Sequence, residues 1–107
     1  MDKSLILNMA TLTDHKDIIC SIAITPNGKK IVSGSRDKTI KIWNINSYKC
    51  LATLTGHKNS VNCLAITPNG NSIISGSWDK TIKIWDINSY ECLATLTGHK
   101  NSVYCLA

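Results

Sequence analysis

The stretch Ser-Gly-Ser-Trp-Asp-Lys-Thr-Ile-Lys-Ile-Trp-Asp at residues 75–86 decides the fold, and it has a near copy, Ser-Gly-Ser-Arg-Asp-Lys-Thr-Ile-Lys-Ile-Trp-Asn, at residues 33–44. Its second half, Thr81–Trp85, alternates with a period of two. Ile82 and Ile84 therefore point one way and Lys83 and Trp85 the other, which is typical of a β-strand. A strand is predicted here, and by the same pattern at residues 39–43.

The two stretches belong to a longer internal repeat. Residues 11–52 align with residues 53–94 without a gap, and 29 of the 42 positions are identical. A third copy begins at Thr95 and, as far as Ala107, differs from residues 53–65 only where Tyr104 replaces Asn62. A period of this length is typical of β-propeller blades, but also of the helical HEAT and armadillo repeats.

Local patterns favour the β alternative. In the second copy, strand candidates rich in β-branched residues cover residues 60–67, 72–77, 81–85 and 91–96. Pro68-Asn69-Gly70 is a turn signal, because proline presets φ and Asn-Gly tolerates the left-handed region. No segment carries an apolar stripe at helical spacing. Each copy is therefore predicted to form four short antiparallel strands, and the fold class is all-β.

Composition excludes few functions. The net charge of +5 can attract nucleic acid, but the lysines are spread through the repeat and form no block, which favours a solvated surface. No apolar run is long enough for a membrane span, and the early acid at Asp2 makes a poor signal peptide. An intracellular, cytoplasmic protein is expected. Cys50 and Cys63 recur one repeat later, which favours buried structural thiols over disulfides or metal ligands.

The residues also carry a family resemblance. Gly56-His57 before the first strand and Trp85-Asp86 at the end of the third resemble the Gly-His and Trp-Asp signatures of WD40 repeats. The first copy departs from this pattern at Asp14-His15 and Trp43-Asn44 but keeps the His and the Trp.

The resemblance implies a β-propeller segment of about two and a half four-stranded antiparallel blades, which is an incomplete ring. The whole chain, 1–107, would be a WD40 repeat region: a leading outer strand in 1–14 (roughly Leu7–Leu12), repeats at 15–56 and 57–98, and the start of a third at 99–107. The strand of that third start is expected at Ser102–Ala107.

One set of polar side chains invites a catalytic reading, since His57, Ser75 and Asp79 are the residue types of a hydrolytic triad. The set is duplicated with the repeat, however, and a chain has little use for one active site per blade. The resemblance implies instead a structural hydrogen-bond network, of His15, Ser33, Asp37 and Trp43 in the first copy and of His57, Ser75, Asp79 and Trp85 in the second. Ser35 and Ser77 lie on the same strand face and are the alternative serines. No catalytic residue is predicted.

No metal or cofactor is predicted either. His15, His57 and His99 are one repeat apart, so they would lie on separate blades and cannot converge on one ion. A glycine-rich phosphate loop is absent from the sequence. Gly76 stands inside a predicted strand, where a bend or close packing explains it.

A partner surface is predicted where the copies differ. The resemblance places three positions of each repeat at the top-face mouth of the propeller channel: the third and fifth residues after the His, and the residue before the turn Asp. In this chain they are Ile18, Cys20, Arg36, Ser60, Asn62, Trp78, Ser102 and Tyr104. Trp78 stands where the first copy has Arg36, so the fold requires no tryptophan there, and both residue types are common interface hot spots. The alternative is that these are merely tolerated surface substitutions.

The function predicted is thus a non-catalytic WD40 scaffold segment that mediates protein–protein interaction, as a fragment of a longer array or as a self-assembling unit. One alternative is a basic nucleic-acid-binding module. Another is a set of accessory repeats of a larger signalling or enzymatic protein, and a third is a truncated or recently amplified repeat without a role of its own.

Overall fold

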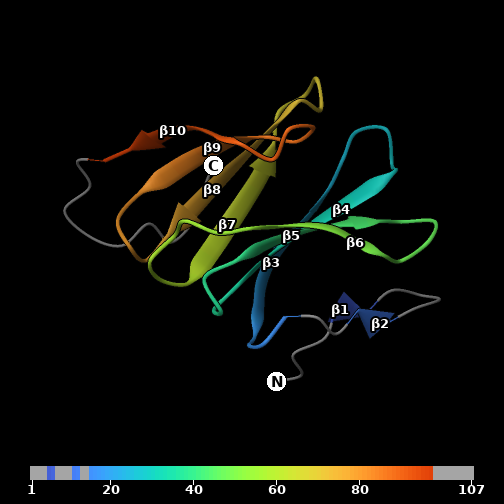
Figure 1. Ribbon diagram of the computed structural model, residues 1–107, viewed down its shortest axis with the longest axis horizontal. Coiled ribbons are helices and arrows are strands. Elements are labelled where there is room, and N and C mark those ends of the chain that lie inside the picture. The colour runs from blue at the N-terminus through green and yellow to red at the C-terminus, as the bar shows by residue number, and fades with distance from the viewer. Residues whose placement is uncertain (1–4, 7–10, 13–14, 98–107) are drawn as a thin grey trace.

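The computed structural model describes residues 5–6, 11–12 and 15–97, and most of them form two antiparallel sheets of four strands each (Figure 1). The first sheet consists of β3 (Ile19–Ile24), β4 (Lys30–Ser35), β5 (Ile40–Asn44) and β6 (Cys50–Leu54). The second sheet consists of β7 (Val61–Ile66), β8 (Ser72–Ser77), β9 (Ile82–Asp86) and β10 (Cys92–Leu96). The all-β expectation is confirmed.

Each sheet is a meander whose strands pair in the order of the sequence. The hairpins between the first two strands turn at Gly28 and Gly70, whose φ values of 71° and 75° lie in the left-handed region that glycine adopts without strain. Equivalent residues then pair in the same register: Ile31 opposes Trp43, and Ile73 opposes Trp85. The four strands expected in the second copy agree with β7–β10 to within one residue at either end.

The N-terminal region differs from the single outer strand expected over roughly Leu7–Leu12. Two short strands, β1 (Leu5–Ile6) and β2 (Thr11–Leu12), pair antiparallel with one another in a two-stranded sheet of their own. This pairing satisfies their backbone groups locally. Residues 7–10, and the strand expected at Ser102–Ala107, lie outside the described residues.

The main core lies between the two sheets. β7 packs against β3 and β4, and the buried cluster draws on both sheets. Its residues are Val32, Ile40, Ile42, Leu54, Val61, Ile73, Trp85 and Ile87. A smaller cluster, centred on Ile31 and Trp43, lies on the opposite face of the first sheet. The sheets are therefore stacked face to face through apolar side chains, in the order in which they occur along the chain.

The expectation of buried thiols is only partly right. Cys63 is buried on β7, but Cys20 and Cys92 are exposed and Cys50 is half-buried; all four are free. Cys20 stands at the position where the β3–β4 register shifts, and Cys92 stands at a similar shift on β10, a strand with one neighbour. Strand edges and bulges leave side chains uncovered, which the repeat spacing does not reveal.

Candidate functional site

The four side chains expected to form a network in the first copy are brought together from four segments of the chain. His15 precedes β3, Ser33 lies on β4, Asp37 lies in the β4–β5 turn and Trp43 lies on β5. His15 Nδ1 is 2.9 Å from Asp37 Oδ2, and His15 Nε2 is 2.6 Å from Ser33 Oγ. Trp43 Nε1 donates to the same Ser33 oxygen at 2.9 Å. The result is a continuous chain of hydrogen bonds from the indole to the carboxylate.

The second copy repeats this arrangement. His57 Nδ1 lies 2.8 Å from Asp79 Oδ2, His57 Nε2 lies 2.7 Å from Ser75 Oγ, and Trp85 Nε1 donates to Ser75 Oγ at 2.8 Å. Each imidazole also lies near the indole of its own network, with ring centroids 6.3 Å and 6.2 Å apart. The geometry therefore survives the changes from Gly56 to Asp14 and from Asp86 to Asn44.

The direction of each bond follows from what the groups can donate. A carboxylate only accepts, so the proton lies on His15 Nδ1, and the bare Nε2 accepts from the Ser33 hydroxyl. That hydroxyl in turn accepts the Trp43 N–H. Desolvation lowers the pKa of His15 and of His57, with the neighbouring aspartates opposing the shift. Both imidazoles are consequently neutral at physiological pH, as the bonding pattern requires.

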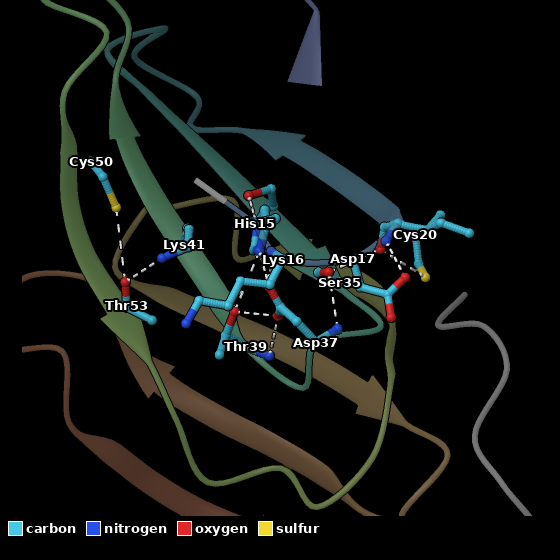
Figure 2. A network of polar contacts seen from close by, with 12 residues as sticks. His15, Lys16, Asp17, Cys20, Ser35, Asp37, Thr39, Lys41, Cys50 and Thr53 are labelled. Carbon is cyan, nitrogen blue, oxygen red and sulfur yellow. Dashed lines mark hydrogen bonds and ion pairs between the residues drawn. The ribbon is translucent and has the colours of Figure 1, made fainter. Parts of the chain in front are cut away.

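The aspartates are held as carboxylates by more donors than histidine alone. Burial opposes ionisation of Asp37, but hydrogen bonds from the Thr39 hydroxyl, from His15 and from the Lys16 and Thr39 backbone N–H groups outweigh it and lower its pKa to about 2 (Figure 2). Asp79 has the equivalent donors, and its pKa is likewise about 2. Thr39 and Thr81 were not predicted from the sequence. The identical Asp-Lys-Thr in both copies was a signal for them, since aspartate commonly binds the backbone two residues on.

The alternative serines, Ser35 and Ser77, make different hydrogen bonds from those of Ser33 and Ser75. The Ser35 hydroxyl donates to the Ile18 carbonyl at 2.9 Å and accepts the Asp37 backbone N–H at 3.1 Å. The Ser77 hydroxyl donates to the Asn59 carbonyl, one residue earlier in the repeat, and accepts the Asp79 backbone N–H. Ser33 and Ser75 thus hold the imidazole, whereas Ser35 and Ser77 tie the turn to the segment before the sheet's first strand.

The arrangement has the order of a hydrolytic triad, Ser–His–Asp, but no access for a substrate. Ser33 and Ser75 are fully buried, and each already accepts an indole N–H. Shallow depressions of about 350 and 310 Å³ lie beside the two networks. Their described walls include Asp37 and Asp79 but neither serine. An attacking hydroxyl must reach a carbonyl carbon, and a side chain with no exposed surface cannot.

Within the described ranges, no three His, Cys, Asp or Glu side chains are grouped closely enough to hold a metal ion. In the same part of the chain, no helix has the length and apolar character that a bilayer crossing requires.

The positions expected at the top face come from both sheets and lie at one end of them. The Arg36 N–H donates to the Ile18 carbonyl at 2.9 Å, and the Trp78 N–H donates to the Ser60 carbonyl at 3.1 Å. Cys20 Sγ lies 3.7 Å from Ser60 Oγ, which joins the two sheets at this end. Arg36 and Cys20 are exposed, and Ile18 and Asn62 are half-buried.

Two of these positions, Trp78 and Ser60, differ widely in exposure. The Trp78 side chain is 40 % exposed. Ser60 departs from the expectation of an accessible residue, because it is only 3 % exposed and a partner cannot reach it. Its contact with Cys20 places it between the two sheets. Ser102 and Tyr104 lie outside the described residues.

Comparison with known proteins identifies the family. The model described as "WD domain, G-beta repeat" matches residues 7–44, 48–86 and 90–107. The chain belongs to this WD repeat family. Each described sheet is then one WD40 blade, and the end of the sheets with Arg36 and Trp78 is the end at which the family resemblance placed the partner surface.

Solved structures of WD40 proteins superpose closely on the chain. The RRP9 WD40 repeats match with a TM-score of 0.86 and 30 % identity over 91 % of this chain and 31 % of that one. U3-55K matches with a TM-score of 0.82 and 34 % identity over 85 % of this chain and 28 % of that one. The fold is therefore that of a WD40 propeller segment whose two sheets do not close a ring.

Two curated relatives match over about one repeat. The transcriptional repressor tup12 of Schizosaccharomyces pombe is 51 % identical over 37 residues, which are 35 % of this chain and 6 % of that protein. A ribosome biogenesis protein BOP1 homolog of Drosophila melanogaster is 46 % identical over 37 residues, 5 % of its length. The chain therefore spans only a small part of the length of these relatives.

Proposed function

We propose that this chain is a non-catalytic scaffold segment that binds a protein or peptide partner through its top face, formed by Ile18, Cys20, Arg36, Asn62 and Trp78. The observation that carries the proposal is Trp78, an indole that is 40 % exposed at a position where the first sheet has arginine. Burying an aromatic side chain of this size against a partner gains more free energy than burying most other residue types, and tryptophan and arginine are enriched among interface hot spots.

The rigidity of the turns that carry these residues supports the same proposal. Trp78 directly precedes Asp79, whose carboxylate is bonded to His57, Thr81 and the Lys58 backbone. Arg36 precedes the equivalent Asp37. A side chain on a turn fixed in this way loses little conformational freedom when a partner binds, so more of the contact energy appears as affinity. In this proposal, the buried hydrogen-bond network keeps the turns that carry Arg36 and Trp78 in one conformation.

The absence of catalysis is part of the proposal. Its support is the burial of Ser33 and Ser75, the hydroxyls that His15 and His57 contact through Nε2. We further propose a cytoplasmic location. The remaining blades are supplied either by a longer chain, in which these repeats accompany other domains, or by further copies of this one. The WD repeat family and the four free thiols in the described part of the chain support an intracellular protein.

The proposal is tested with peptides selected against the full chain from a random display library, their affinity measured by fluorescence anisotropy. Trp78→Ala is expected to weaken binding about tenfold or more, the loss of roughly 1.4 kcal/mol or more typical of a hot spot. The melting temperature should not change. Leu93→Ala, an exposed apolar side chain on β10, is the matched control and should bind as the wild type does. Peptides that bind Trp78→Ala and the wild type equally would refute the proposal.

The nucleic-acid alternative is distinguished by salt. Binding through the lysines would release counterions, so the affinity for an oligonucleotide would fall steeply and linearly with the logarithm of salt concentration. A peptide anchored by an indole should show a shallow dependence. Tight, salt-sensitive binding of a random oligonucleotide that survives Trp78→Ala would favour the alternative.

A further inference from the structure

At each end of the stack, one apolar sheet face has no other four-stranded sheet of the described residues against it. In the sheet-to-sheet interface, the first sheet contributes its trailing face, defined as Val32, Ile40, Ile42, Ala52 and Leu54. The second sheet contributes its leading face, defined as Val61, Leu64, Ile66, Ile73, Trp85 and Ile87. Because the sheets are copies, the first sheet also has a leading face and the second a trailing face, and neither of these takes part in that interface.

The two outer faces have the same residues as the inner ones at all but three positions. The second sheet's trailing face is Ile74, Ile82, Ile84, Ala94 and Leu96, paired across strands in the same register as its counterpart. The first sheet's leading face is Ile19, Ile22, Ile24, Ile31, Trp43 and Ile45. The differences from the covered faces are Ile74 for Val32, Ile19 for Val61 and Ile22 for Leu64, all between aliphatic side chains.

On each outer face, some side chains are more exposed than their equivalents in the interface between the sheets. Leu54 on the covered trailing face is 4 % exposed, whereas the equivalent Leu96 is 47 % exposed. On the leading faces, Leu64 and Ile66 pack against the shared core, but their equivalents Ile22 and Ile24 are 50 % and 55 % exposed. At these three positions, a side chain is better covered where a sheet lies against it. Ile31 and Trp43 on the first sheet's leading face are different, because they are 1 % and 2 % exposed in that sheet's own smaller cluster.

We propose that a second copy of this chain stacks its leading face, with Ile22 and Ile24, onto the trailing face of the first, with Ile84 and Leu96. The contact repeats the one already present between β3–β6 and β7–β10. Because the two faces differ, the association is head-to-tail, and it either closes into a ring or continues as an open chain of copies. Since propellers have roughly four to eight blades, about two to four copies would complete a ring.

The polar contacts of the internal interface are not all repeated in the docked one. Within the chain, the Leu64 N–H donates to Ser21 Oγ across the interface. In the docked interface, the residue equivalent to Ser21 is Cys63 of the first copy, whose sulfur accepts weakly. The association between copies is therefore weaker than the stacking within one chain, and it depends on concentration.

The test is sedimentation velocity of the purified full chain with three variants. Ile24→Asp blocks the leading face, and Leu96→Asp blocks the trailing face. Leu93→Asp is the matched control on the same strand, because its equivalent Leu51 stays exposed although a sheet covers the trailing face there. Ile24 and Leu96 are about half exposed in the single chain, so these substitutions leave its own fold intact, which the near-ultraviolet circular dichroism of its tryptophans checks.

The wild type and Leu93→Asp are expected to associate with rising concentration, whereas Ile24→Asp and Leu96→Asp alone stay monomeric. Mixed together, these two variants should form a 1:1 complex that grows no further, since one intact face of each kind remains. A wild type that is monomeric at every concentration would overturn the proposal and leave the faces to blades of a longer chain. Self-association of either blocked variant, or no complex in the mixture, would overturn it too.

Discussion

At the residue scale, the decisive feature is a buried hydrogen-bond chain in which every member is satisfied. Across the described part of the molecule, no buried side-chain nitrogen or oxygen is left without a partner. A buried polar group without a partner costs free energy, whereas a complete network favours a single geometry. His57 is the middle member, bonded to Ser75 on one side and to Asp79 on the other.

Removing that middle member should be costly. We expect His57→Ala to lower the free energy of unfolding by about 2–4 kcal/mol, because it opens a cavity and leaves Ser75 and Asp79 without their partner. Urea denaturation measures the change. Lys58→Ala is the control: it removes an exposed side chain but keeps the backbone N–H that binds Asp79. Equal stability of His57→Ala and Lys58→Ala would mean that the network does not stabilise the fold.

The same residues predict a dependence of stability on pH. The pKa of His15 and of His57 is lower in the folded state than the ordinary value of 6.5, so below that pH the unfolded chain takes up protons first and the fold loses stability. Asp37 and Asp79, with pKa values of about 2 against the ordinary 3.8, add a second loss as the pH falls from 3.8 towards 2. Unfolding midpoints measured from pH 8 to pH 3 should fall in both windows. A constant midpoint between pH 7.5 and 5 would contradict the neutral, buried imidazoles.

At the element scale, the packing of one sheet on the next depends on a close approach at β4. A Cβ atom added at Gly34 would lie 2.8 Å from Val61 Cγ1 and 3.3 Å from Val61 Cβ, closer than van der Waals contact allows. The glycine expected from the sequence to mark close packing in a strand is its copy, Gly76. The reason is visible at Gly34: β7 of the next sheet lies directly against it.

Gly34→Ala should therefore force the sheets apart and lower the free energy of unfolding by about 1–3 kcal/mol. Val61→Ala removes the Cγ1 atom that the new methyl group would meet. The double variant should consequently lose less than the sum of the two single losses, as a double-mutant cycle by urea denaturation would show. Simple additivity would indicate that the contact between Gly34 and Val61 does not limit the approach.

At the scale of the whole molecule, the two sheets share one apolar cluster and should unfold together. Ile40 lies on the first sheet and Ile73 on the second, and both are fully buried in that cluster. Nearest-neighbour contacts of this kind couple repeats into one cooperative unit. The stability of each sheet then depends on the other sheet as well.

We expect Ile40→Ala to lower stability by about 2–5 kcal/mol and to do so in both sheets. Amide hydrogen exchange followed by NMR tests this, since protection should fall by a similar factor in β5 and in β9. Ile22→Ala, at an uncovered position of the first sheet, is the control and should change protection little in dilute solution. Faster exchange confined to β3–β6 would mean that the sheets unfold independently.

The sequence by itself determined the local structure: the repeat, the four strands of each copy, the turns and the residues of the hydrogen-bond network. These features depend on contacts within one repeat, and each of the two similar copies contains the signals for them. The sequence therefore shows the period-two alternation, the turn glycines and the His, Ser, Asp and Trp positions.

Only the tertiary structure decided which of two identical side chains is buried. Leu54 and Leu96 have the same neighbours in sequence, and Ser60 looked as accessible as Trp78, yet their exposures differ widely. The physical reason is that burial depends on the sheet that lies across from a residue, not on the strand that carries it.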